Sequence, residues 1–106
     1  MASDKAVAKL ISMIDGTTSI ELKAACAKGL GAAGGDKAVS KLIGMIGGTS
    51  SIELKAACAL GLGAAGGDKA ISKLISMVDG TTSIELKAAC ALALGQAAKN
   101  DRAECA

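Results

Sequence analysis

The sequence repeats itself with a period of 32 residues, and this periodicity constrains the fold more than any other feature. Each copy begins with Asp-Lys-Ala, and the three copies span residues 4–35, 36–67 and 68–99. A period of this length is typical of arrays in which each repeat is one supersecondary unit that stacks on its neighbours. Residues 1–106 are therefore predicted to form a single repeat domain. Residues 100–106 are either a degenerate start of a fourth repeat, in which Asn100 replaces the capping Asp, or an end cap.

Each copy contains two segments with the apolar spacing of an amphipathic helix. In copy one the first segment covers residues 4–14, with Asp4 as its expected N-cap. The second covers about Ile20 to Ala33 and ends at Gly34-Gly35, because glycine takes the left-handed conformation without steric cost. A hydroxyl residue followed three residues later by glutamate predicts a capping box before this helix, with the pairs Thr18–Glu21, Ser50–Glu53 and Thr82–Glu85.

Two short helices with one apolar stripe each cannot bury a core alone, but stacked pairs bury a continuous one. The sequence therefore predicts an all-α fold, a right-handed two-layer α-solenoid of three helical hairpins. Half of the chain is apolar, yet it contains no Phe, Trp or Tyr. The core must then be built from Ala, Leu, Ile, Val and Met, and its packing must come from close approach of the backbones.

Two motifs in copy one resemble a known repeat family. Residues 6–15 read AVxxLIxxID and residues 22–34 read LKxACAxGLGxAG, which is similar to the short HEAT-like repeat of phycobilisome lyases. The segment ALALGQAAKN, residues 91–100, resembles the end of an armadillo repeat. The resemblance implies a solenoid whose second helices form a concave, partner-binding face. It departs from the family at Lys23, where the family has Arg, and at Gly47, where copy two lacks the Asp, so an intact Asp–Arg ladder between repeats is not expected.

The glycines late in the second helix match a dinucleotide-binding fingerprint by spacing only. Gly29 to Gly34 and Gly61 to Gly66 read G-x-G-x-x-G. The fingerprint requires a strand before it and a helix that begins at its first glycine, whereas these glycines lie near the end of a helix. Copy three replaces two of them with Ala93 and Ala98. Close helix packing explains these glycines better than nucleotide binding, and no cofactor is expected.

Cysteine recurs once in each copy, at Cys26, Cys58 and Cys90. Stacked helices lie roughly 8–10 Å apart, whereas a disulfide needs Cα atoms closer than about 7 Å. Neighbouring cysteines of this ladder therefore cannot bond to one another. We interpret them as buried small thiols on the apolar side of the second helix, and no metal site is expected because the chain has no His and no tight ligand spacing.

The composition argues against several classes of function. A net charge of +2 gives no case for nucleic-acid binding. The lysines along the first helices, at positions 5, 9, 37, 41, 69 and 73, have no Arg or aromatic residue beside them and are interpreted as a solvated ridge. Without His or Tyr no paired acid, base or nucleophile stands out, so no catalytic residue is expected. The apolar runs are short and interrupted by charge, which predicts a cytoplasmic protein with no membrane contact.

With these classes of function set aside, the sequence favours an interaction surface. On a helical wheel one face of the second helix points away from the apolar stripe, and nine residues are predicted to bind a partner there: Glu21, Lys28, Ala32, Glu53, Leu60, Ala64, Glu85, Leu92 and Gln96. The favoured hypothesis is a non-catalytic scaffold that binds a protein or peptide on this concave face. The alternative is a structural self-assembler that stacks head to tail into oligomers or filaments, and an idealised or fragment sequence suits either hypothesis.

Overall fold

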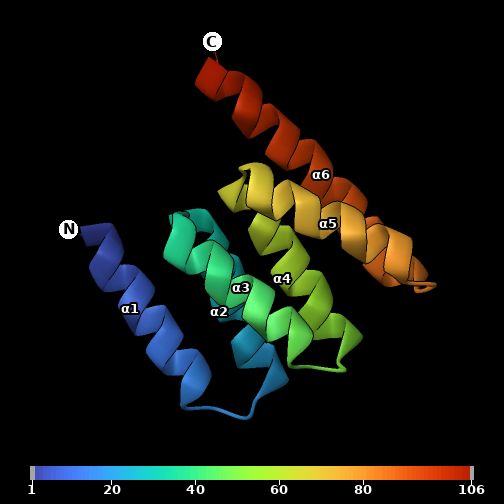
Figure 1. Ribbon diagram of the computed structural model, residues 1–106. Coiled ribbons are helices and arrows are strands. Elements are labelled where there is room, and N and C mark those ends of the chain that lie inside the picture. The colour runs from blue at the N-terminus through green and yellow to red at the C-terminus, as the bar shows by residue number, and fades with distance from the viewer. Residues whose placement is uncertain (1, 106) are drawn as a thin grey trace.

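The computed structural model describes the backbone of residues 2–105 and the side chains of residues 4–100. Within that range the chain forms six α-helices: α1 (Ala2–Asp15), α2 (Ile20–Ala33), α3 (Asp36–Gly47), α4 (Ile52–Ala65), α5 (Asp68–Gly80) and α6 (Ile84–Cys105). The odd-numbered helices form one layer and the even-numbered helices the other (Figure 1). The predicted all-α solenoid of three two-helix repeats is confirmed.

Pairs of glycines turn the chain from one repeat into the next. Gly34 and Gly35 have φ of 75° and 91°, and Gly66 and Gly67 have φ of 73° and 90°. These values lie in the left-handed region that residues with a Cβ adopt only at a cost. Copy three carries Ala98 and Lys99 at the corresponding positions, so α6 does not turn and continues to Cys105. Residues 100–105 thus form a helical extension of α6.

The extension contacts the preceding repeat through Asn100, which sequence reasoning had placed at a capping position. Its side-chain amide donates to the carbonyl oxygens of Gly63 at 3.3 Å and Ala64 at 2.9 Å. These carbonyls belong to the last turn of α4, where they have no partner within the helix. Gln96 donates to the Asn100 Oδ1 at 3.4 Å. The prediction that Asn100 replaces a capping Asp is therefore wrong, because the residue closes the end of α4 and starts no helix.

Two other capping predictions are also wrong by one or more residues. The N-cap of α2 is Ser19, whose Oγ accepts a hydrogen bond from the backbone N–H of Leu22, and Ser51 and Ser83 do the same in the later repeats. The Thr18–Glu21 capping box is thus absent. Asp4 lies inside α1, and in repeat two Gly35 is the N-cap of α3 with Asp36 as its first residue. These aspartates still favour the helix, because negative charge in the first turn opposes the helix dipole.

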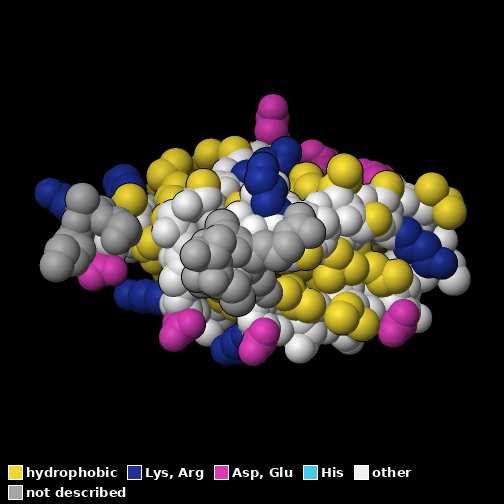
Figure 2. All heavy atoms as spheres, turned by 90° about the horizontal axis from the view of Figure 1, so that it is seen from above, with side chains coloured by type: hydrophobic (Ala, Val, Ile, Leu, Met, Phe, Trp, Pro, Cys, Tyr) yellow, Lys and Arg dark blue, Asp and Glu magenta, His cyan; other side chains and the backbone are white. Residues whose placement is uncertain are grey.

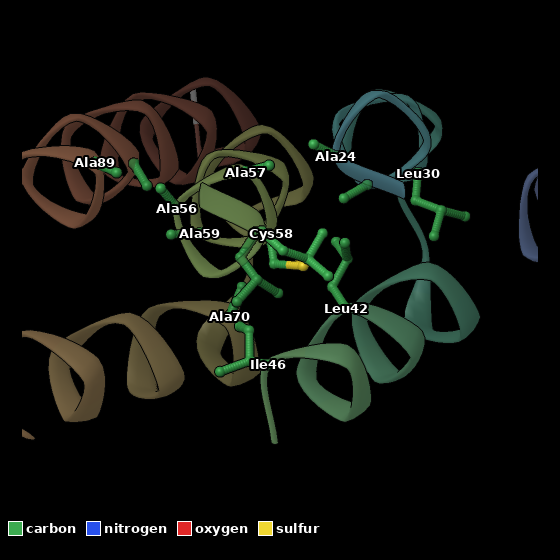
Figure 3. Packing of buried hydrophobic residues seen from close by; sticks show 14 of the residues in the cluster. Ala24, Leu30, Leu42, Ile46, Ala56, Ala57, Cys58, Ala59, Ala70 and Ala89 are labelled. Atoms are coloured by element: carbon green, nitrogen blue, oxygen red, sulfur yellow. The ribbon is translucent and has the colours of Figure 1, made fainter. Parts of the chain in front are cut away.

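The core lies between the two layers and is built from one or two large side chains per helix. Leu30, Leu42, Leu62, Leu74, Cys58 and Cys90 are the largest fully buried side chains among the described residues. Figure 3 shows Cys58 of α4 directed from the even-numbered layer toward Leu42 of α3. All three ladder cysteines are buried and free, so their predicted role as buried thiols is confirmed.

The even-numbered helices pack at backbone distance because the residues between them are glycine and alanine. A Cβ atom placed on Gly63 would lie 2.6 Å from the Ala93 Cα, and one on Gly61 would lie 2.6 Å from the Ala27 carbonyl oxygen. A Cβ on Gly31 would lie within 2.5 Å of the Gly61 carbonyl carbon. The interpretation as packing residues is confirmed for Gly31, Gly61 and Gly63, whereas Gly34 and Gly66 serve the turns between repeats.

Close packing in one layer gives the array its curvature. The contacts of α4 with α2 and with α6 are extensive, whereas α3 touches α1 and α5 at only a few points. A stack with one tight and one spread layer bends toward the tight layer. The outward side of α2, α4 and α6 is therefore the inner, concave side of the solenoid.

Candidate interaction surface

The nine residues predicted for the partner-binding face lie on the outward side of α2, α4 and α6, and we call them the open face. In each helix they recur at steps of seven and four residues, which keeps them on one side of a helix with 3.6 residues per turn. Eight of the nine are exposed, and Leu60 is half-buried. The structure therefore brings the predicted residues together on a single continuous side of the molecule.

The two leucines of the open face differ in burial. Leu60 packs partly against the core, which the wheel analysis did not anticipate. Leu92, at the same position of α6, has 70% of its surface exposed. The open face thus has a half-buried leucine on its central helix and an exposed leucine on α6.

Charge on the open face is distributed asymmetrically. Glu21, Glu53 and Glu85 are exposed in the first turns of the three helices. They form an acidic row across the end of the face where the helices begin. Lys28 is the basic member of the predicted set and lies on α2. A ligand that spans the three helices would meet carboxylates at this end and leucine side chains farther along.

The contacts between successive repeats, which we call the seams, contain polar side chains whose pairing the sequence analysis did not predict. The Lys41 Nζ lies 2.7 Å from the Asp15 Oδ1, which joins α1 to α3. This pair lines a cavity of about 300 Å³ together with Lys23 and Leu54. The equivalent cavity between repeats two and three, about 230 Å³, is lined by Lys55 and Lys73, and Gly47 stands at the sequence position that corresponds to Asp15. The carboxylate that pairs with a lysine between repeats one and two is therefore missing between repeats two and three.

Burial makes two of the ladder thiols, Cys58 and Cys90, poor nucleophiles. It raises the pKa of the Cys58 thiol from 9.0 to about 12, and it also raises the pKa of Cys90. Because the thiolate is the reactive form, both groups remain protonated and inert near neutral pH. Within the part of the chain that the structure describes, no three His, Cys, Asp or Glu side chains gather as metal ligands would.

The architecture and the surface define an α-solenoid built of two-helix repeats. The family model for HEAT repeats matches residues 3–103, and the chain belongs to this family. HEAT repeats commonly serve as protein-interaction scaffolds and are generally non-catalytic. The comparisons with curated proteins and with solved structures give no match. None of the helices in residues 2–105 is both long enough and apolar enough to cross a membrane.

Proposed function

We propose that this protein is a non-catalytic interaction scaffold that binds a segment of a partner protein on its open face. The observation that carries the proposal is the pattern of differences among the three second helices. Their sequences are nearly identical, yet they present Lys28, Leu60 and Leu92 at one open-face position and Ala32, Ala64 and Gln96 at another. Each of the three equivalent helices thus offers a different pair of side chains on the side that a ligand can reach.

The chemistry of the face supports a partner segment that combines basic and apolar side chains. Basic groups of the partner would meet the row formed by Glu21, Glu53 and Glu85, because complementary charge steers and orients binding. Apolar side chains of the partner would cover Leu92 and the exposed part of Leu60. Small residues elsewhere on the face allow a helix or an extended strand to approach closely.

A labelled peptide of alternating Lys and Leu pairs tests the proposal, with an acidic peptide of equal length as the comparison probe. Fluorescence anisotropy should show binding of the basic peptide, and amide chemical shifts should change mainly on α2, α4 and α6. The double variant Glu53→Lys with Leu92→Glu should weaken binding about ten-fold, which corresponds to about 1.4 kcal/mol. Both side chains are exposed, so the fold should be retained.

The matched control changes charge on the opposite layer. Asp68→Lys lies at the exposed start of α5, changes the net charge in the same direction as Glu53→Lys, and should leave the affinity for the basic peptide almost unchanged. Equal weakening by this control would mean that the peptide responds only to net charge. Shift changes confined to α1, α3 and α5 would show that the open face is not the binding surface.

A further inference from the structure

The outer flank of repeat three exposes residues that the repeat array buries at every earlier position. On α6 the flank comprises Ile84, Ala88, Ala91 and Gly95, all exposed, whereas α4 carries the same residue types at positions that α6 covers: Ile52, Ala56, Ala59 and Gly63. Ile84 is 78% exposed and Ile52 is largely covered. On α5, Ile75 is likewise exposed while its equivalent Ile43 packs against the core. We call these five exposed residues the tail flank, and apolar side chains are visible at this end of the molecule, on the right of Figure 2.

The first repeat has the complementary property on its other side. Ala6, Leu22 and Ala25 are exposed, whereas the equivalent residues of repeat two, Ala38, Leu54 and Ala57, are buried against repeat one. Leu22 is 38% exposed and Leu54 only 3%. We call Ala6, Leu22 and Ala25 the head flank. Head and tail flanks therefore carry the two halves of the contact that the chain makes between its own repeats.

The charged residues at the two flanks occupy the same repeat positions as the ion pair between repeats one and two. Within the chain, Asp15 at the end of α1 pairs with Lys41 of the following repeat. The equivalent of Asp15 in repeat three is Asp79, which is exposed at the tail flank, and the equivalent of Lys41 in repeat one is Lys9, which is exposed near the head flank. A second copy docked in the register of the internal repeats would bring its Lys9 to Asp79 of the first copy.

The packing density of the internal contact restricts what else can cover the tail flank. In the α4–α6 contact a Cβ on Gly63 would be 2.6 Å from the Ala93 backbone, so the helices fit only where both sides have small residues. Gly95 is the tail-flank equivalent of Gly63, and the head side of α2 offers Ala25 and Gly29 in the required register. A helix with large side chains would be held away from the flank.

We propose that the tail flank of repeat three is a docking surface for the head flank of a second copy of this chain. The contact repeats the internal one, with small residues of α2 against α6 and Lys9 against Asp79. Asn100 lies on the side of α6 that contacts α4, away from the tail flank. The contact is heterologous, so it forms open chains or closed rings and is distinct from the open face.

Complementary surface variants test this arrangement. A tail-blocked variant carries Ile84→Arg and Ala91→Arg, and a head-blocked variant carries Ala25→Arg, all at exposed positions. In sedimentation velocity the parent should associate as its concentration rises to about 1 mM. Each blocked variant alone should be a monomer, and an equimolar mixture should form dimers only, through the one intact head and the one intact tail.

Charge reversal adds a readout of register. Asp79→Lys should weaken association of the parent chain about five-fold, the size expected of one exposed ion pair. Adding Lys9→Glu to the same chain should restore it, whereas Lys5→Glu in its place should not. Circular dichroism and urea unfolding verify that each variant is folded.

Several outcomes would overturn the proposal. A parent that stays monomeric at about 1 mM leaves no role for a second copy and assigns the tail flank to some other occupant. A blocked variant that still associates alone would indicate a symmetric contact, either head to head or tail to tail. A mixture of the two variants that remains monomeric would exclude the head-to-tail arrangement directly.

Discussion

Replacing Gly31 with alanine should separate α2 from α4 and destabilise the array. The new Cβ would lie within 2.5 Å of the Gly61 carbonyl carbon, whereas ordinary contacts are 3.4–4 Å. The obstructing atoms are backbone, so no change of side-chain rotamer can relieve the clash. Overpacking of this kind costs about 1–3 kcal/mol, and the upper end applies here because a whole helix must move.

The same substitution also brings a gain that has to be subtracted. Alanine is about 1 kcal/mol more favourable than glycine inside a helix, so the expected net loss for Gly31→Ala is about 2 kcal/mol. Gly29→Ala is the matched control in the same helix. Its Cβ would meet only the two Leu10 methyl groups at 3.4 Å, and copy three already has Ala93 at the equivalent position. This control should be neutral or stabilised by up to about 1 kcal/mol.

Urea unfolding followed by circular dichroism measures the difference between the two variants. With an m-value of about 1.5 kcal/mol/M, a gap of about 2–3 kcal/mol corresponds to about 1.3–2 M between their midpoints. Because each repeat contacts only its neighbours, Gly31→Ala should also broaden the transition as repeat one uncouples from repeat two. Equal midpoints for Gly31→Ala and Gly29→Ala would refute the claim that backbone contact at Gly31 holds the inner layer together.

Two further predictions concern the cysteine ladder and the second seam. Burial raises the pKa of Cys58 from 9.0 to about 12, so between these pH values the folded state retains a proton that the unfolded state loses. The contribution of the Cys58 thiol to stability is therefore complete below pH 9 and declines as the pH rises toward 12. This decline, measured by urea unfolding, should be smaller in Cys58→Ala. Gly47→Asp should place a carboxylate near Lys73 as Asp15 lies near Lys41, in open space and without positive φ. It should stabilise the fold by up to about 1 kcal/mol relative to Gly47→Asn, and a gain that persists at high salt or in a Lys73→Met background would contradict the ion-pair explanation.

The helices and their stacking could be predicted from the sequence because the physical signals are local and occur three times. Ile20 to Ala33 was placed correctly at both ends, since a serine and a pair of glycines bound it in the sequence. The capping residue was nevertheless assigned to Thr18 instead of Ser19. Both residues carry a hydroxyl group, and the pattern with Glu21 favoured the wrong one; only the backbone geometry distinguishes them.

The role of Asn100 shows where reasoning from the repeat pattern failed, although a signal was present. Alignment with Asp68 suggested a cap, because the pattern treats equivalent positions as having equivalent roles. The loss of the glycine pair at Ala98 and Lys99 was the better guide. Without residues that tolerate positive φ the chain cannot turn, so position 100 must remain in α6, where its side chain reaches the end of α4.

Exposure could not be predicted from the sequence of a repeat, because it depends on the place of that repeat in the array. Leu22 and Leu54 share the local sequence Ile-Glu-Leu-Lys-Ala-Ala-Cys, yet Leu22 is 38% exposed and Leu54 is 3% exposed. Ile52 and Ile84 differ in the same way at the other flank. A helical wheel assigns one environment to all three copies, whereas the stack gives three environments to one sequence. Residues selected to pack between repeats therefore become surface at the two flanks, and their chemistry there is still that of a repeat contact.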